Sequence, residues 1–266
     1  YLMLAAEKSN QNKAAQAACE FFRQALKVVE GARISLDPDK ERRIHQGLAS
    51  ASVDIGDINT ALENYKKAME VCQKHGLITD EMEILPEIAW AKAFTTMKRK
   101  EVIRSYEEGI ARAKEVGDKG AESQILSIKG FYLGNLGYRY EGYNMAVEAE
   151  AMALQTGNPR AVIRARGLRA LAERWLGRPD KTIELTEGMV DALSKMFNLS
   201  QLSGLIFIRG LSLAEIGRIE DAFAELKYGI DLCERFGGAF HLGRLYNTLG
   251  YCYSEIHHPE EAWKWN

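Results

Sequence analysis

Small and apolar residues recur along the chain in blocks that lie about 40 residues apart. Each block contains the end of one helical pattern, a turn position and the start of the next helical pattern; the turn residues are Gly56, Met97, Gly137, Gly177, Gly217 and His257. A small residue usually follows five positions later, and further core-type residues follow four and seven positions after it, as in Ala61, Tyr65 and Ala68. This spacing places three side chains on one helix face. The pattern therefore predicts helix pairs that repeat along the whole chain.

Glycines, prolines and polar residues indicate where these helices begin and end. Four glycines suit left-handed C-caps: Gly76, Gly117, Gly157 and Gly237. Three prolines suit the first position of a helix: Pro38, Pro159 and Pro259. We expect helices near 1–10, 13–30, 38–55, 58–75, 80–96, 99–116, 119–136, 139–156, 159–176, 179–196, 199–216, 219–236 and 239–256, and a last one from residue 259. No run alternates convincingly enough to predict a strand.

The helix expected at 80–96 departs from the common pattern. Asp80 and Glu83 have the spacing of a capping box at its start. Pro86 lies in its interior and predicts a kink or a local restart, because proline lacks a backbone N–H. Met97 occupies the turn position where glycine is usual. We therefore expect a bend or a weaker interface in this repeat.

The order of a small-residue motif, a glycine turn and Ala-x3-aromatic-x2-Ala resembles the tetratricopeptide repeat, most clearly over 47–76 and 207–237. The resemblance covers essentially the whole chain. The usual repeat of that family is about 34 residues long, whereas the repeat here is about 40 residues long. Longer units resemble the repeat regions of large bacterial signalling ATPases, nucleotide cyclases and maltose-regulon-type activators. The resemblance implies an all-α, right-handed superhelix of antiparallel helix pairs. We expect one repeat domain over 1–266, with units near 1–37, 38–78, 79–118, 119–158, 159–198 and 199–238 and a truncated unit at 239–266.

Charge and cysteine usage narrow the functional classes. The formal net charge is −2, which gives the chain no general attraction to nucleic acid or to an anionic membrane. No apolar run is long enough to predict a membrane-spanning helix. The four cysteines form no CxxC pair, so buried thiols in a reducing, cytoplasmic compartment are expected: Cys19, Cys72, Cys233 and Cys252.

The two ends of the sequence predict a piece of a longer protein. The first residue is Tyr1, and Asn266 falls shortly after the start of a predicted helix. The exposed end of a repeat array is apolar unless a capping unit covers it. Trp263 and Trp265 therefore indicate that more chain, a partner or a second copy of the chain covers this end.

Sequence motifs for catalysis are missing. The chain contains no phosphate-binding GxxxxGK[ST] loop, no HExxH and no GxSxG nucleophile motif. The adjacent His257 and His258 have no evident third ligand, so no metal site and no cofactor are expected. We predict a protein that is not an enzyme, although a catalytic groove remains the less favoured alternative.

The expected binding surface is the concave side of the superhelix, which the first helix of each pair lines in the resembling family. The family's groove positions correspond here to Arg43, Gln46, Glu87, Phe131, Asn135, Arg164, Arg174, Phe207, Arg244, Asn247 and Tyr251. Arginine, amide and aromatic groups of this kind suit protein recognition. We predict a protein-interaction scaffold, the regulatory or sensory region of a larger signalling protein, whose partner is a protein, a peptide or another domain of the same polypeptide. The alternative is a domain that senses a small-molecule ligand and controls a linked ATPase, cyclase or transcription-regulating domain.

The helix expected at 159–176 and its flanking turn are rich in arginine: Arg160, Arg164, Arg166, Arg169, Arg174 and Arg178. One interpretation is salt bridges within the repeats, to Glu148, Glu150, Glu184 or Glu187. The other is docking of an acidic peptide or a phosphorylated segment, in which Arg164 and Arg174 take part. Nucleic acid is the least favoured partner of this helix.

Overall fold

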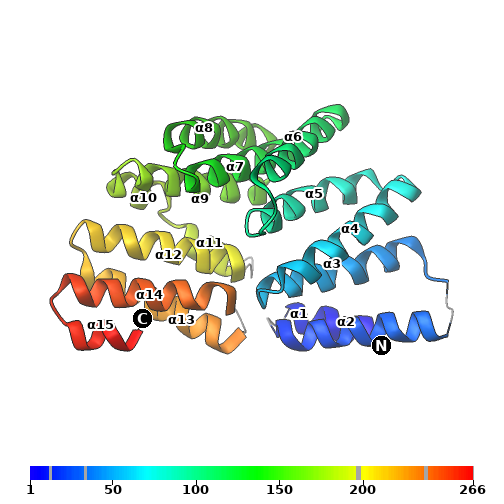
Figure 1. Ribbon diagram of the computed structural model, residues 1–266, viewed down its shortest axis with the longest axis horizontal. Coiled ribbons are helices and arrows are strands. Elements are labelled where there is room, and N and C mark those ends of the chain that lie inside the picture. The colour runs from blue at the N-terminus through cyan, green and yellow to red at the C-terminus, as the bar shows by residue number, and fades with distance from the viewer. Residues whose placement is uncertain (12–13, 33–34, 196–198, 237–238, 266) are drawn as a thin grey trace. The chain divides into compact units, whose positions relative to one another are not determined.

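The computed structural model describes residues 1–11, 14–32, 35–195, 199–236 and 239–265. Within these residues the chain forms fifteen helices and no strand (Figure 1). The all-α fold predicted from the sequence is therefore confirmed. The chain divides into two compact units, residues 1–129 (unit 1) and residues 130–266 (unit 2), and the division falls inside one helix. The single domain expected from the sequence stays a prediction.

The helices of unit 1 follow one another along the chain in pairs. They are α1 (Leu2–Gln11), α2 (Ala15–Gly31), α3 (Pro38–Asp54), α4 (Ile58–His75), α5 (Ile78–Lys92), α6 (Arg99–Val116) and the first part of α7 (Lys119–Asn135).

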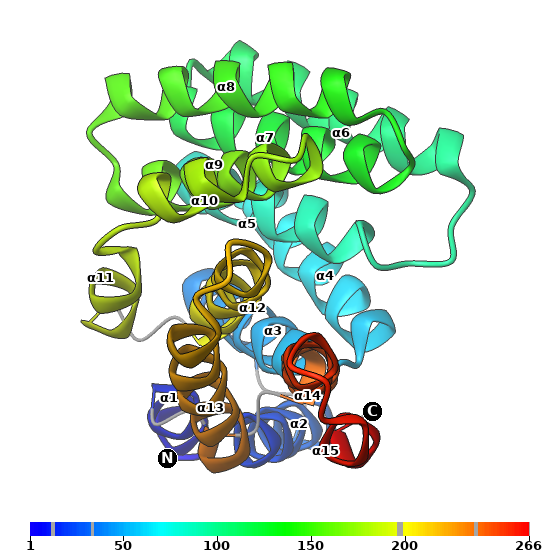
Figure 2. The ribbon, with the colours of Figure 1, turned by 90° about the vertical axis from the view of Figure 1, so that its left-hand side faces the viewer.

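Unit 2 continues the same order, starting from the last part of α7. Its further helices are α8 (Arg139–Thr156), α9 (Pro159–Trp175), α10 (Pro179–Leu185), α11 (Met189–Lys195), α12 (Leu199–Glu215), α13 (Ile219–Phe236), α14 (Ala239–Glu255) and α15 (Pro259–Trp265). Within this unit, α8 lies on one side of the layer that α7 and α9 form, as two views show (Figures 1 and 2). The first helices α12 and α14 pack directly against each other.

The repeated small and apolar positions form the buried face of each second helix. Ala61, Tyr65 and Ala68 of α4 are all buried, and so are the matching Ala222, Leu226 and Gly229 of α13. Small residues in these positions let two helix backbones approach closely. In unit 2 a Cβ atom on Gly142 of α8 would lie 2.4 Å from the carbonyl oxygen of Gly130 on α7. The small and apolar residues that recur along the sequence are thus the residues through which neighbouring helices pack.

The turn position has the left-handed backbone conformation that favours glycine. The φ angles of Gly56, Gly137, Gly177 and Gly217 lie between 75° and 96°. His257 has the same conformation, with φ at 60°, although it carries a side chain. The predicted left-handed C-caps are confirmed at Gly76, Gly117 and Gly157, and Gly237 lies outside the described residues.

Helix α5 corrects three predictions. It begins at Ile78 with Leu77 at the N-cap, so the capping box at Asp80 and Glu83 is wrong. It continues through Pro86, so the predicted restart there is wrong too. It ends at Lys92, whereas the sequence predicted an end at residue 96. The backbone N–H and the hydroxyl of Thr95 both donate hydrogen bonds to the Lys92 carbonyl. A threonine hydroxyl that bonds the backbone in this way competes with continued helix.

The prediction of one continuous helix at 179–196 is also wrong, because this segment forms two helices, α10 and α11. The break falls at Thr186, whose hydroxyl donates to the Thr182 carbonyl and accepts a hydrogen bond from Arg209 Nη1 at 2.8 Å. Gly188 then takes a left-handed conformation, with φ at 71°. The sequence conceals this break because Thr182, Thr186 and Met189 keep the spacing of the repeat.

Candidate binding surface

The candidate site residues of unit 2 all lie on first helices, namely α7, α9, α12 and α14. We call this set the first-helix face; it consists of Phe131, Asn135, Arg164, Arg174, Phe207, Arg244, Asn247 and Tyr251. Several of its members contact a residue on the next first helix, as the following contacts show.

Arg174 links α9 to α12. Its Nη2 donates to Glu215 Oε1 at 2.5 Å, and its side chain is 21% exposed. Tyr251 of α14 lies near the same charges: burial, together with the carboxylates of Glu255 and Glu215, raises the pKa of its hydroxyl. Because Glu215 already pairs with Arg174, a carboxylate of an acidic ligand would have to displace the Glu215 carboxylate from Arg174.

An aromatic pair lies at the α7 end of the face. Phe131 and Trp175 stack with ring centroids 6.1 Å apart and an interplanar angle of 21°. A Cβ atom on Gly134 would lie 2.0 Å from the Trp175 ring, so the indole packs directly against the α7 backbone. Asn135 is exposed, and its side-chain amide donates to the Phe131 carbonyl at 3.1 Å. Phe131 itself is buried, which leaves the half-buried Trp175 as the more accessible aromatic group.

Two contacts complete the face toward α14. The guanidinium of Arg244 lies 5.7 Å from the centroid of the Phe207 ring, a cation–π distance. With its amide oxygen turned toward Arg164, Gln201 accepts hydrogen bonds from Arg164 Nε at 3.1 Å and Nη2 at 3.2 Å. Asn247 is exposed. The face therefore offers cationic, amide and aromatic groups that neighbouring helices hold in place.

The three candidates of unit 1 are more scattered. Arg43 is exposed and pairs with Glu7 of α1 at 2.6 Å, while Glu87 of α5 is half-buried. Gln46 accepts a hydrogen bond from Arg42. The buried Arg42, which the sequence did not single out, also pairs with Asp39 and with Asp80 of α5. Nothing in the sequence distinguishes the buried Arg42 from the exposed Arg43 beside it, so only the structure shows that Arg42 connects Asp39, Gln46 and Asp80.

Three of the six arginines in the α9 region bind buried carboxylates. Arg166 and Arg169 both bind the buried Glu150 of α8, at 2.6 and 2.5 Å. Arg169 and Arg178 lie 3.8 and 3.1 Å from the buried Glu173. The expected pairing with Glu150 is confirmed for Arg166 and Arg169, although it joins α8 to α9 and therefore two neighbouring units. Arg178 pairs instead with Glu173, which was not among the expected acceptors. Arg164 and Arg174 are the members whose contacts point to α12 instead.

The cysteines are packing residues. All four are free thiols and buried. Burial raises the pKa of Cys72 and of Cys252 to about 11, so both thiols stay protonated near neutral pH. Among the described residues, no group of three His, Cys, Asp or Glu side chains is placed to hold a metal ion. No helix in the same residues has both the length and the apolar character needed to span a bilayer.

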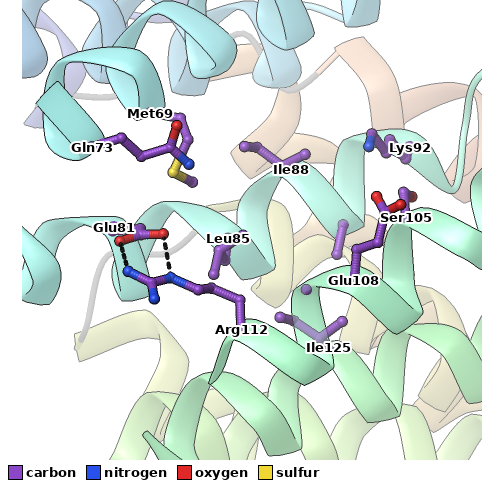
Figure 3. A pocket seen from close by; sticks show the side chains of 12 residues that line it. Met69, Gln73, Glu81, Leu85, Ile88, Lys92, Ser105, Glu108, Arg112 and Ile125 are labelled. Atoms are coloured by element: carbon purple, nitrogen blue, oxygen red, sulfur yellow. Dashed lines mark hydrogen bonds and ion pairs between the residues drawn. The ribbon is translucent and has the colours of Figure 1, made fainter. Parts of the chain in front are cut away.

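A cavity of about 360 Å³ is present in unit 1, between α4, α5, α6 and α7 (Figure 3). Its walls combine apolar side chains with Lys92 at one end and an ion pair of Glu81 and Arg112 at the other. Sequence reasoning missed this cavity, although it expected an irregular repeat at this position.

Comparisons with known proteins identify the fold. No family model and no curated protein sequence matches the chain. Among solved structures, a Rap protein complexed with Competence and Sporulation Factor has a TM-score of 0.74 at 14% identity, covering 100% of this chain and 72% of that one. The Rap conjugation gene regulator of plasmid pLS20, in complex with the Phr* peptide, has a TM-score of 0.74 at 11% identity, with coverage of 100% and 72%.

A third similar structure is a signal transduction ATPase from Pyrococcus horikoshii that has a tetratricopeptide repeat sensor. Its TM-score is 0.55 at 17% identity, and the match covers 96% of this chain but only 40% of that one. These likenesses confirm the resemblance found in the sequence. The chain therefore has a tetratricopeptide-type helical-repeat fold.

Proposed function

We propose that this chain is a regulatory protein-interaction scaffold, and that the first-helix face of unit 2 binds an acidic peptide or an acidic segment of a partner domain. The observation that carries the proposal is the group of Arg164 and Arg174 on α9 and Arg244 on α14, with aromatic groups beside them. Arginine binds carboxylates through paired hydrogen bonds, and flat aromatic groups add apolar contact.

The contacts of these arginines support a surface that can exchange partners. Arg174 is already paired with a carboxylate and Arg164 faces a neutral amide. A peptide carboxylate at Arg164 would therefore replace a weaker, neutral acceptor by a charged one. At Arg174 it would compete with Glu215, which makes acidic ligands bind in a salt-dependent way.

The similar structures add support from fold analogy. One Rap protein was solved with Competence and Sporulation Factor, another with the Phr* peptide, and a further similar structure is the quorum sensor NprR from B. thuringiensis. A peptide-responsive regulator without catalytic activity is the function in keeping with them. The buried, protonated thiols fit a reducing compartment, so we place this function in the cytoplasm.

The test is a charge reversal on the first-helix face. Peptides would be selected from an Asp- and Glu-rich library, and their Kd measured by fluorescence polarisation at two salt concentrations. We expect the Arg164→Glu/Arg174→Glu double variant to weaken binding by at least a hundredfold, since each arginine removed costs about tenfold or more.

The matched control is the double variant Arg104→Glu/Arg235→Glu, which changes the net charge equally on the second helices α6 and α13. Both of these arginines are exposed and paired with a carboxylate on their own helix. Circular dichroism melts would establish that both double variants are folded. Equal affinities of the two double variants would reject the first-helix face as the binding surface.

A second candidate function is sensing of a small molecule, which the cavity of unit 1 favours. A thermal-shift screen that compares acidic peptides with small metabolites separates the two functions, because a ligand that binds the folded state stabilises it by an amount that rises with the ratio of its concentration to its Kd.

A further inference from the structure

The cavity of unit 1 has an apolar middle and two polar ends (Figure 3). Its volume of about 360 Å³ lies within the range of small-molecule sites. It is lined by Met69, Gln73, Glu81, Leu85, Ile88, Ala89, Lys92, Ser105, Glu108, Gly109, Arg112 and Ile125. What this cavity binds is a separate question from the peptide surface of unit 2, because none of its residues belongs to the first-helix face.

The cavity arises from the irregular α5–α6 pair. Helix α5 has 15 residues, whereas α3, α7, α9, α12 and α14 have 17. The segment 93–98 that connects α5 to α6 is longer than the turns at 55–57 and 216–218. Helices α5 and α6 also approach each other less closely than α3 and α4 do. The early end of α5 thus leaves space that a regular repeat fills.

The middle of the cavity suits an aliphatic group. Leu85 and Ile88 of α5 are only half-buried, and they face Ile125 of α7 across the cavity. Gly109 of α6 contributes no side chain, and a Cβ atom there would already lie 3.2 Å from Ile125 Cδ1. A ligand that covers Leu85 and Ile88 gains the free energy of removing apolar surface from water.

The end of the cavity near α4 carries no free charge. Arg112 donates from Nε and Nη2 to the two oxygens of Glu81, both at 2.9 Å, and from Nη1 to Glu115. Hydrogen bonds from Arg112 lower the pKa of the buried Glu81 carboxyl, so this pair stays ionised and mutually compensated. The charged groups at this end are therefore already paired with one another and leave no unpaired charge for a ligand.

Lys92 defines the opposite end. Its side chain is half-buried, and within the described part of the chain its ammonium makes no hydrogen bond and no ion pair within 4.0 Å. Glu108, the nearest acid on the cavity wall, is paired with Arg104 at 2.9 Å. The Ser105 hydroxyl donates to the Val102 carbonyl. Burial lowers the pKa of Lys92, and the charge of Glu108 opposes this effect only in part.

We propose that this cavity binds a small amphipathic monocarboxylate, whose aliphatic body covers Leu85, Ile88 and Ile125 and whose carboxylate pairs with Lys92. A half-buried cation that makes no hydrogen bond or ion pair is unfavourable. A carboxylate beside an apolar chain pairs with the ammonium and also covers the apolar wall. A dicarboxylate or a nucleotide finds no second unpaired cation on the cavity wall, so a single negative charge is the fitting one.

The test uses the full chain labelled at isoleucine δ1-methyl groups and titrated with sodium decanoate below its micelle concentration. We expect saturable shifts of the Ile88 and Ile125 methyl signals, with those of Ile206 and Ile230 in unit 2 unchanged. Lys92→Met keeps most of the apolar stem and removes the charge, so it should raise the Kd about tenfold. The control Lys100→Met alters an exposed lysine of α6 outside the cavity and should leave the Kd unchanged.

A second variant keeps the proposal falsifiable if the charge change perturbs folding. Ile88→Trp would occupy the middle of the cavity, and the shift of Ile125 on adding decanoate should disappear. Three results would overturn the proposal: no saturable shift at Ile88 and Ile125, an equal Kd for wild type and Lys92→Met, or equally tight binding of 1-decanol.

Discussion

The α12–α13 pair and the α5–α6 pair are built on the same repeat, yet they pack differently. In the former, the turn 216–218 contains a left-handed glycine, and Leu226 of α13 fits against Gly210 of α12, where a Cβ atom would lie 2.6 Å from the leucine. In the latter, Met97 replaces the glycine and a cavity opens beside α5. The difference shows that the repeat specifies close packing only when both its turn and its small residues are kept.

The largest effect should come from truncating one leucine in each pair. Leu226 is fully buried, so Leu226→Ala should lower the free energy of unfolding by about 3 kcal/mol through lost burial and the space left behind. Leu85 is half-buried beside an existing cavity, so Leu85→Ala should cost about 1 kcal/mol. Urea unfolding followed by circular dichroism measures both values. Equal losses would mean that α5 packs as tightly as α13.

A smaller loss of stability is expected from adding one methyl group to each of two helical glycines. Gly142→Ala places a Cβ atom 2.4 Å from a backbone oxygen of α7, which cannot move alone, so we expect a loss of about 2 kcal/mol. Gly109→Ala meets the flexible end of Ile125 at 3.2 Å and gains about 1 kcal/mol of helix propensity. Its net effect should lie near zero. A strongly destabilised Gly109→Ala variant would show that α6 has no room to adjust.

The smallest contrast concerns the turn position. His257 takes a left-handed conformation, so His257→Gly should stabilise the chain by about 1 kcal/mol. Among the described residues His257 is the only non-glycine with positive φ, so Met97→Gly relieves no such strain. It should instead cost about 0.5 kcal/mol through added backbone freedom. Thermal melts of the two variants measure the signs, and stabilisation by Met97→Gly would contradict this account of the α5–α6 pair.

Much of the fold was predictable because the repeat signals are local. The positions of Gly56, Gly76 and Ala61 report a turn, a helix end and a close helix contact, and each depends on residues nearby in the chain. The early end of α5 at Lys92 and the break at Thr186 were not predictable in this way. At Thr186 the interaction comes from Arg209 on another helix. At Lys92 the signal is local, since the Thr95 hydroxyl competes with the helix, but a threonine near an expected helix end does not by itself mark where the helix stops.

The candidate surface was only partly predictable for a similar reason. Family positions located Arg174 and Arg244 on first helices, but the partners that compensate or orient them, Glu215 and Phe207, depend on how neighbouring helices align. Trp175 and Arg42 escaped notice because their roles come from packing across helices. The cavity beside Lys92 follows from space that a helix leaves empty, which no residue pattern records.

Site-specific photo-crosslinking tests the proposed peptide surface most directly. A benzoylphenylalanine would replace either Asn247 on the first helix α14 or Tyr228 on the second helix α13, both of which are exposed. The selected acidic peptide would then be irradiated with each variant. We expect a cross-link from position 247 that excess unlabelled peptide removes, and none from position 228. Cross-linking from position 228 with none from position 247 would contradict the proposal that the first helices form the binding surface.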